Sequence, residues 1–199
     1  MQALSHHSGQ HATGQASGML EYMQMKVAII AMVSADGRLT RGTETNIHAW
    51  RSPEEGAMFT KLLGQHEVVI VGRKGYEAAG RPKPREGRLY AVMTRHPERF
   101  KELTVPDHLE FMDDSPHDLM QNLQKRGYHS AAITTGGDLN NDFLAAGVVD
   151  ELYLTIEPYM FGAGGDLAGT KALNVSLTLL DVQQLNDRGT LLAHYKLGR

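Results

Sequence analysis

The stretch Val-Val-Ile-Val-Gly-Arg-Lys-Gly-Tyr-Glu, residues 68–77, decides the fold class of this 199-residue chain. Its first four residues are β-branched and apolar, which is typical of a short strand buried on both faces of a sheet. Gly72 ends this run, and the residues that follow it predict a helix over 73–79. We therefore expect a strand that passes through a glycine directly into a helix.

The turn at Gly72 is a candidate phosphate site. The first turn of a helix offers free backbone N–H groups and the positive end of the helix dipole, and both favour an anion. Arg73 and Lys74 add two cationic side chains at the same place, and a guanidinium group pairs well with a phosphate. The alternative is an ordinary strand–turn–helix connection with two solvated cations.

The rest of the chain continues the alternation of strands and helices. Ser52 followed by Pro53 is a typical helix start, and the polar segment 38–49 predicts a long mobile loop of the kind that covers a site. The expected strands span residues 26–33, 68–71, 89–93, 109–112, 131–135, 151–157, 177–184 and 191–196, and the expected helices span about residues 53–63, 73–79, 116–126 and 139–146.

This order of elements predicts an α/β fold with a mostly parallel sheet, helices on both faces and antiparallel strands at the C-terminal end. Ligands of such sheets bind beyond the carboxyl ends of the strands. No G-x-G-x-x-G fingerprint follows a predicted strand, so a standard Rossmann domain is not supported. The edge that we expect to bind ligand collects residues 33–37, 72–74, 94–96 and 135–138 and the end of strand 151–157.

Composition excludes several classes of protein. The net charge of −3 gives no reason to expect a nucleic acid or an anionic membrane as partner. The absence of cysteine excludes a disulfide framework, a thiolate metal site and a cysteine nucleophile. With no membrane-spanning apolar run and no secretory signal, a soluble cytoplasmic protein is the expectation.

The domain organisation is expected to be simple. Residues 1–24 are rich in Ser, His, Gln, Gly and Ala and predict a flexible tail, followed by one domain over residues 25–199. His7 and His11 stand four residues apart, but the glycines and small residues around them argue against a rigid ligand set. We therefore predict no metal site.

Several motifs resemble a known superfamily. The segment VGRKGYEAAGRPKP followed by RLYAVMTR resembles dihydrofolate reductase, as does ELYLT at residues 151–155. The segments VSADGRLT and GGDLNNDFLAAGVVDELYLTIEPYMFGAG look more like the reductase domain of riboflavin biosynthesis, the C-terminal domain of bifunctional deaminase-reductases. The resemblance covers residues 26–196 and implies the dihydrofolate reductase-like three-layer α/β/α fold.

The resemblance also implies NADPH as cofactor. Gly72, Arg73 and Lys74 would bind a cofactor phosphate, with the 2′-phosphate as the partner of Arg73, and the strand end at 94–96 looks like the second element around the 2′-phosphate. The turn at 135–138 would approach the diphosphate, with Thr135 beside the nicotinamide. The implied cofactor-binding residues are Gly72, Arg73, Lys74, Thr94, Arg95, His96, Thr135, Gly136, Gly137 and Asp138.

For the substrate, the resemblance points to the start of the helix after Trp50. In folate reductases a carboxylate there holds the pterin and helps to supply a proton, and the matching position is Glu55, with Glu54 beside it. The alternative is that these acids only suit the first turn of a helix. Asp36 either takes part in the reaction or makes the turn at Gly37. Trp50 and Thr155 match substrate-contacting positions, with packing and an ordinary strand threonine as the alternatives.

The function that follows is an NADPH-dependent reductase of the riboflavin-biosynthesis type, acting on a pyrimidine- or pterin-like small molecule such as a ribosylaminopyrimidine phosphate. A true dihydrofolate reductase is the first alternative, and a non-catalytic nucleotide-binding protein is the second. The chain carries no His/Cys zinc pattern of the deaminase domain. The resemblance further implies a homodimer.

Overall fold

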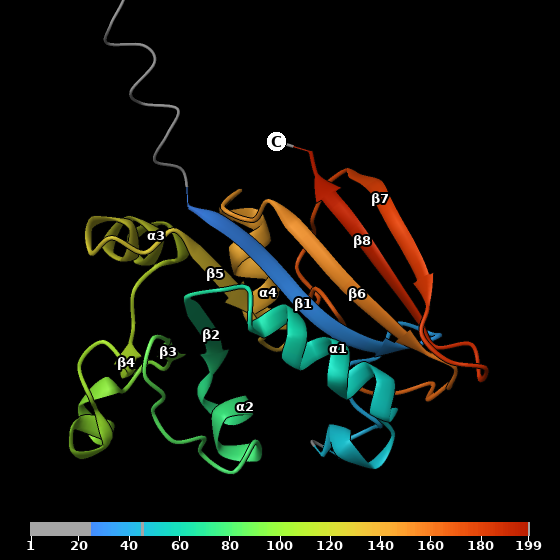
Figure 1. Ribbon diagram of the computed structural model, residues 1–199, viewed down its shortest axis with the longest axis horizontal. Coiled ribbons are helices and arrows are strands. Elements are labelled where there is room, and N and C mark those ends of the chain that lie inside the picture. Colours follow the sequence, from blue (N-terminus) through green and yellow to red (C-terminus); the bar gives the residue numbers. More distant parts are fainter. Residues whose placement is uncertain (1–24, 45, 199) are drawn as a thin grey trace, which may run out of the picture.

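The computed structural model describes residues 25–44 and 46–198, so the expected tail 1–24 with His7 and His11 lies outside the described residues. The described chain forms an eight-stranded sheet in the order β4-β3-β2-β5-β1-β6-β8-β7 (Figure 1). Its strands are β1 (Lys26–Ser34), β2 (Val68–Gly72), β3 (Leu89–Met93), β4 (Leu109–Met112), β5 (Ser130–Ile133), β6 (Glu151–Glu157), β7 (Leu177–Gln184) and β8 (Leu191–Leu197).

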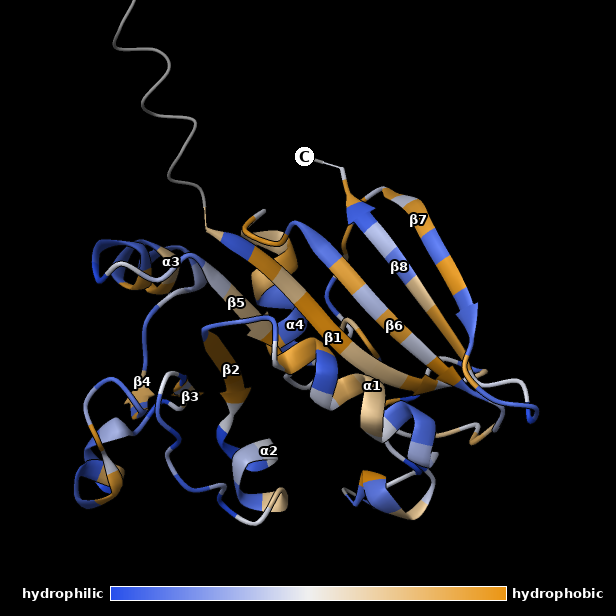
Figure 2. Cartoon of the chain, in the orientation of Figure 1, coloured by the Kyte–Doolittle hydropathy of each residue, from blue (hydrophilic) through white to orange (hydrophobic). Residues whose placement is uncertain are grey.

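The strand directions confirm the predicted fold class. Strands β1 to β6 all pair in parallel, with β1 between β5 and β6 and β2 between β3 and β5. Strand β8 pairs antiparallel with β6 and with the outermost strand, β7. The apolar runs that predicted β1 and β2 lie in the interior of the sheet, as their hydropathy shows in Figure 2, because a central strand needs apolar side chains on both faces.

Helices cover both faces and complete three layers. On one face, Leu62 of α1 (Pro53–Leu63) packs with Ile30, and Tyr76 of α2 (Arg73–Ala78) packs with Val92. On the other face, helices α3 (Pro116–Lys125) and α4 (Gly137–Ala145) contribute Leu119, Leu123 and Phe143 to the largest core cluster. The predicted helix start at Ser52 is confirmed, since its hydroxyl accepts a hydrogen bond from Glu55 N–H. Ser115 caps α3 in the same way, by accepting from Asp118 N–H.

Some boundaries differ from the prediction. Strand β5 ends at Ile133 and α4 begins at Gly137, two residues before the predicted helix start. A pair of glycines argued for a longer turn, but Gly136 takes the extended conformation of an N-cap. Two 3-10 helices, η2 (Ile47–Ala49) and η3 (Pro97–Leu103), were not predicted because such short elements have weak sequence signals.

The first half of the predicted mobile loop is hydrogen-bonded to a distant segment. Backbone N–H groups of Leu39 and Gly42 donate to the carbonyls of Gly165 and Ala163, and the hydroxyl of Thr40 accepts from Gly165 N–H. Arg38 pairs with Asp166 in addition. Residues 38–42 and 163–166 therefore form a joined pair of segments.

Strand β7 ends the sheet without a covering layer. All eight of its residues are exposed, and Leu177, Leu179, Leu180 and Val182 each leave 46–53% of their surface open. In Figure 2 apolar and polar residues both appear along this outer strand. Contiguous exposed apolar side chains on an edge strand are unusual for an isolated monomer.

Among the described residues, none of the helices combines the length and the apolar character that crossing a membrane requires.

Candidate active site at the carboxyl edge of the sheet

The six parallel strands bring the predicted site residues to one edge of the sheet. In Figure 1 the arrowheads of β1, β2 and β6 point to the side where α2 and the first turn of α1 lie. The edge has two halves. The ends of β2, β3 and β5 form the half assigned to cofactor, and the ends of β1 and β6 with the start of α1 form the half assigned to substrate.

The cofactor half contains two helix starts without side-chain caps. Gly72 and Gly136 are the N-caps of α2 and α4, and no side chain accepts a hydrogen bond at either cap. By contrast, α1 and α3, whose starts are not assigned to cofactor, carry serine caps. Helix N–H groups left without a cap are available to a phosphate oxygen.

Cationic side chains accompany these helix starts. Arg73 donates to Glu77 of the same helix at 2.6 Å, and 40% of its side chain is exposed. Lys74, Arg95 and His96 are exposed. A solvent-exposed ion pair such as Arg73–Glu77 contributes at most about 1 kcal/mol, so Arg73 can exchange Glu77 for a phosphate at little cost.

The packing of the chain itself accounts for one of the three glycines at these helix starts. We expected Gly72, Gly136 and Gly137 to allow close approach of an anion, but a Cβ on Gly137 would overlap the carbonyl oxygen of Asp166. That glycine is therefore required by the packing of the chain itself. A Cβ on Gly72 would touch Leu139 at 3.1 Å, whereas nothing lies within 4 Å of one on Gly136. Of these three, only Gly136 faces open space.

The remaining cofactor candidates are engaged within the protein. Thr135 donates its hydroxyl proton to Asn140 at 2.5 Å, and the Thr94 hydroxyl accepts from the backbone N–H of His96 at 3.3 Å. Asp138 lies in the first turn of α4. These contacts order the ends of β3 and β5 as turns, and each side chain retains partial exposure.

In the substrate half, the structure distinguishes Glu54 from Glu55, the two acids between which the sequence could not choose. Glu55 is buried, with 3% of its surface exposed, while the exposed Glu54 accepts a hydrogen bond from Asn186 at 3.1 Å. Its own backbone N–H and then the Asn186 hydrogen bond hold the pKa of Glu54 below its usual value. Successive helix residues point about 100° apart, so one of the two faces the sheet and the other faces solvent.

Burial raises the pKa of Glu55 to about 7. The Arg51 guanidinium, whose Nε lies 3.4 Å from Glu55 Oε2, opposes this shift, and the negative charge of Glu157 adds to it. Gly56 leaves the room that Arg51 occupies, since a Cβ there would lie 3.1 Å from its Nη2. Glu55 is thus a buried carboxyl group that exchanges a proton near neutral pH.

Two buried polar atoms of the substrate half lack a hydrogen bond among the described residues, although Arg51 Nε lies 3.4 Å from one of them. Within residues 25–44 and 46–198, Glu55 Oε2 and Trp50 Nε1 are buried and make no hydrogen bond. Thr155, 4% exposed, follows on β6 between Met32 and Leu192 in the sheet register. Buried polar atoms without partners are rare and indicate a place where a water or ligand completes the hydrogen bonding.

The carboxylate of Asp36 is engaged within the protein. It accepts hydrogen bonds from the Ser34 hydroxyl at 2.5 Å and from the backbone N–H groups of Phe161 and Gly162. These bonds lower its pKa to about 2. They favour the second of the two expected readings, in which Asp36 makes the turn, and they anchor the segment after β6; a part of Asp36 in the reaction stays a prediction.

Sequence reasoning missed an aromatic cluster in this half. Trp50 packs edge-on against Phe161, with ring centroids 5.0 Å apart, and against Tyr159 at 6.4 Å. The guanidinium groups of Arg41 and Arg188 lie over these rings at 5.1–5.9 Å. The signal that could have found it is the pair of aromatics immediately after a strand that ends at the ligand edge.

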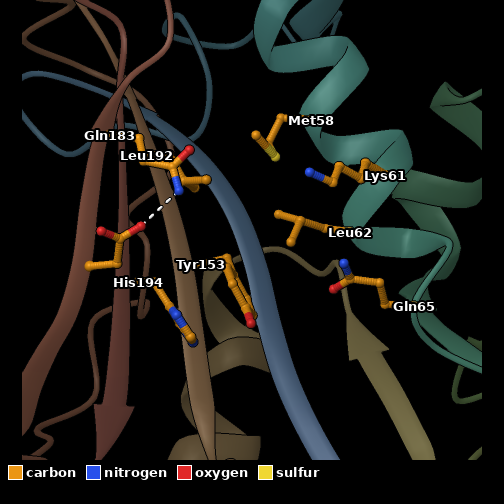
Figure 3. A pocket seen from close by; sticks show the side chains of 9 residues that line it. Met58, Lys61, Leu62, Gln65, Tyr153, Gln183, Leu192 and His194 are labelled. Atoms are coloured by element: carbon orange, nitrogen blue, oxygen red, sulfur yellow. Dashed lines mark hydrogen bonds between the residues drawn. The ribbon is translucent and has the colours of Figure 1, made fainter.

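A separate cavity of about 170 Å³ lies on the α1 face of the sheet (Figure 3). Met58 and Leu62 of α1 face Tyr153 and His194 across it. Tyr153 stacks on His194 at 4.0 Å in the middle of β6 and β8. None of the predicted site residues lines this cavity.

Comparisons with known proteins agree with this geometry. The sequence pattern of the RibD C-terminal domain matches residues 25–191. A relative from Bacillus subtilis (strain 168), the uncharacterized protein YwjB, is 24% identical over 148 residues, which make up 71% of this chain and 82% of that protein.

Solved structures show the same fold at low sequence identity. A pyrimidine reductase-like protein from Corynebacterium diphtheriae superposes with a TM-score of 0.71 at 15% identity, covering 89% of this chain and 93% of that one. A bifunctional deaminase/5-amino-6-(5-phosphoribosylamino)uracil reductase from Thermotoga maritima gives 0.68 at 16% identity, covering 87% of this chain and 56% of that one. Dihydrofolate reductase from Enterococcus faecalis, complexed with NADP(H) and RAB-propyl, gives 0.61 at 16% identity, covering 89% and 99%. The fold is therefore dihydrofolate reductase-like.

Proposed function

The chain belongs to the RibD C-terminal domain family, and on that basis we propose that it is an NADPH-dependent reductase of a pyrimidine- or pterin-like small molecule. The observation that carries the proposal is Glu55. A buried carboxyl group with a pKa of about 7 stands at the carboxyl edge of the sheet, and its Oε2 makes no hydrogen bond among the described residues. This is the arrangement that proton transfer at neutral pH requires.

The cofactor half fits a phosphorylated dinucleotide. The start of α4 at Gly136 has free N–H groups and open space, and the start of α2 adds Arg73 and Lys74. Arg95 and His96 at the end of β3 supply further cationic contacts. These residues would hold the cofactor phosphates, and the bound cofactor would supply a hydride.

The chain contributes positioning and a proton. Thr155 and Trp50 would form the wall of the substrate pocket, and Glu55 would hold an N–C–NH₂ edge of the heterocycle by hydrogen bonds. Glu55 would donate its proton to the ring nitrogen next to the electrophilic carbon, because that nitrogen would gain electron density on reduction. The joined segments 38–42 and 163–166 would limit the access of water.

The direct test is NADPH oxidation by the purified protein, followed at 340 nm with a panel of aminopyrimidines, ribosylaminopyrimidine phosphates and 7,8-dihydrofolate. Turnover of an aminopyrimidine supports the riboflavin-type reductase. Calorimetric binding of NADPH with no turnover of any substrate would favour a non-catalytic nucleotide-binding protein. The absence of NADPH binding would overturn the whole proposal.

A dihydrofolate reductase is the second candidate because of one specific observation. The structure buries Glu55, the acid that matches the pterin-holding position, and leaves its Oε2 without a hydrogen bond among the described residues. Turnover of 7,8-dihydrofolate in the same assay, with none of the aminopyrimidines, would establish this alternative.

The activity should depend on pH through Glu55. The protonated form is the donor and its pKa is about 7, so kcat is highest below pH 7 and falls about tenfold for each unit above it. A profile of kcat between pH 6 and 9 at saturating NADPH measures this. A kcat that rises across that range would contradict proton donation by Glu55.

We also propose that the protein is a homodimer through β7. This edge strand has one described partner strand and exposes Leu177, Leu179, Leu180 and Val182. An edge strand that pairs antiparallel with a copy of itself gives a two-fold symmetric interface, which satisfies the free backbone groups of both copies at once.

Charged substitutions on β7 test the interface. Leu179→Lys combined with Val182→Lys should convert a dimer into a monomer, as measured by light scattering after size exclusion, because two buried lysines per protomer oppose association. Val105→Lys is the matched control, since Val105 is also exposed (42%) but lies beside η3, far along the sheet order from β7. A monomeric wild type would contradict the proposal.

A further inference from the structure

A second buried acid, Glu157, has no role in the proposed reaction. It ends β6 with 1% of its surface exposed. A glutamate at this depth requires partners, because an unpaired buried charge is strongly unfavourable. Its contacts therefore define what it does.

Both carboxylate oxygens of Glu157 are occupied. Oε1 accepts from the backbone N–H of Ser52 at 2.8 Å, and Oε2 accepts from the hydroxyl of Thr190 at 2.8 Å. Ser52 is the N-cap of α1, whose hydroxyl in turn accepts from Glu55 N–H. Thr190 is fully buried immediately before β8. One side chain thus connects β6, the start of α1 and the start of β8.

Few charged groups surround Glu55 and Glu157. Arg51 approaches Glu55 from the segment before α1, and Glu157 acts on it from β6. Glu54, on the same helix, turns away toward Asn186. On the β7–β8 connection, Arg188 interacts with Glu54 and Glu157. The charge of Glu157 is the only one of these that favours protonated Glu55 in the described residues.

We infer that Glu157 is a positioning residue for Glu55, which anchors the first turn of α1 to β6 and β8 and places a negative charge next to the Glu55 carboxyl group. The inference rests on the proposed proton-donating role of Glu55. It assigns two separable effects to one side chain: the hydrogen bonds fix where Glu55 stands, and the charge adds to the effect of burial in keeping Glu55 protonated.

Two substitutions separate these effects. Glu157→Gln keeps a carbonyl oxygen for Ser52 N–H, reverses the contact with Thr190 so that the amide NH₂ donates to the hydroxyl oxygen, and removes the charge. The kcat pH profile should therefore move to lower pH by up to about one unit, while kcat at pH 6 stays within about twofold of wild type. Glu157→Ala removes both effects and should lower kcat at least about tenfold at pH 6 as well. The KM for NADPH should change less than twofold in both, because the cofactor half lies on other strands.

The control is Glu151→Gln, a carboxylate at the opposite end of β6 that pairs with Lys26 and His194. The Glu151→Gln substitution should leave the kcat pH profile unchanged. If Glu157→Ala does not fold, Glu157→Gln still decides the matter. A kcat pH profile that is identical in wild type and Glu157→Gln would overturn the inference.

A measurement that needs no substrate tests this inference independently of the proposed function. The titration of Glu55 is followed by NMR of carboxyl carbons in protein labelled at glutamate, with Glu55→Gln used for assignment. A midpoint that moves down in Glu157→Gln supports the inference even if the wild type reduces none of the substrates, which would overturn the reductase proposal alone. An unmoved midpoint would overturn the inference, whatever the activity.

Discussion

Glu55→Gln should leave the affinity for NADPH unchanged and lower kcat by about 100-fold to 10,000-fold, which is the usual contribution of a positioned general acid. Glutamine is nearly isosteric and can still contact the heterocycle, but it has no proton to transfer. The measurements are calorimetric titration with NADPH and steady-state turnover of whichever substrate proves active. Unchanged turnover would assign Glu55 to the stability of α1 alone.

Glu54→Gln is the matched control. Glu54 is the neighbouring residue of the same helical turn, but it faces solvent and accepts a hydrogen bond from Asn186. Its substitution should change kcat less than about threefold. Equal losses in the two variants would show that the first turn of α1 matters only as a structural unit.

The raised pKa of Glu55 also predicts how folding stability depends on pH, which can be measured without a substrate. Its pKa is about 7 in the folded protein against an ordinary value of 4.5, so the folded state binds the proton more tightly than the unfolded state. Folding stability from this group is therefore fully present below about pH 4.5 and declines as pH rises to about 7, by about 3 kcal/mol at most. Glu55→Gln should be more stable than wild type at pH 8, by several degrees in Tm, with the difference shrinking at pH 5.

Arg73→Ala should weaken NADPH binding about 10-fold to 100-fold and NADH binding less than about threefold. The proposed partner of Arg73 is the 2′-phosphate, which NADH lacks, and a charge-assisted hydrogen bond contributes about 1.5–3 kcal/mol. Calorimetric titration with each cofactor measures the difference.

The matched control for Arg73 is Arg99→Ala. Arg99 lies on η3, is 70% exposed and also contacts a glutamate, Glu98. Its loss should affect both cofactors within about twofold. Equal weakening of NADPH and NADH in Arg73→Ala would contradict the assignment to the 2′-phosphate.

The sequence was informative where local chemistry sets the structure. Continuous β-branched runs predicted the parallel strands because a strand buried on both faces tolerates few polar residues. Ser52 and Pro53 predicted the start of α1 because capping and a fixed φ act within a single turn. These local signals were sufficient to place the ligand edge.

The details of the substrate half depend on contacts between residues far apart in sequence. Glu54 and Glu55 suit a first turn equally well, and only the packing of α1 on β6 shows which one is buried. Glu157 resembles an ordinary surface acid until Ser52, 105 positions away, is seen to donate to it. The two readings of Asp36 stayed open for the same reason, since its partners at 161 and 162 are invisible in a linear pattern.

The pairing of residues 38–42 with 163–166 has a kinetic consequence. Neither segment can lift from the ligand edge alone without breaking the backbone bonds of Leu39 and Gly42 and the Arg38–Asp166 pair. Asp36 also links the two segments just before they pair, because its carboxylate accepts hydrogen bonds from Phe161 and Gly162 N–H. Any opening that preserves these bonds must move both segments together. The same opening motion would then admit substrate and release product.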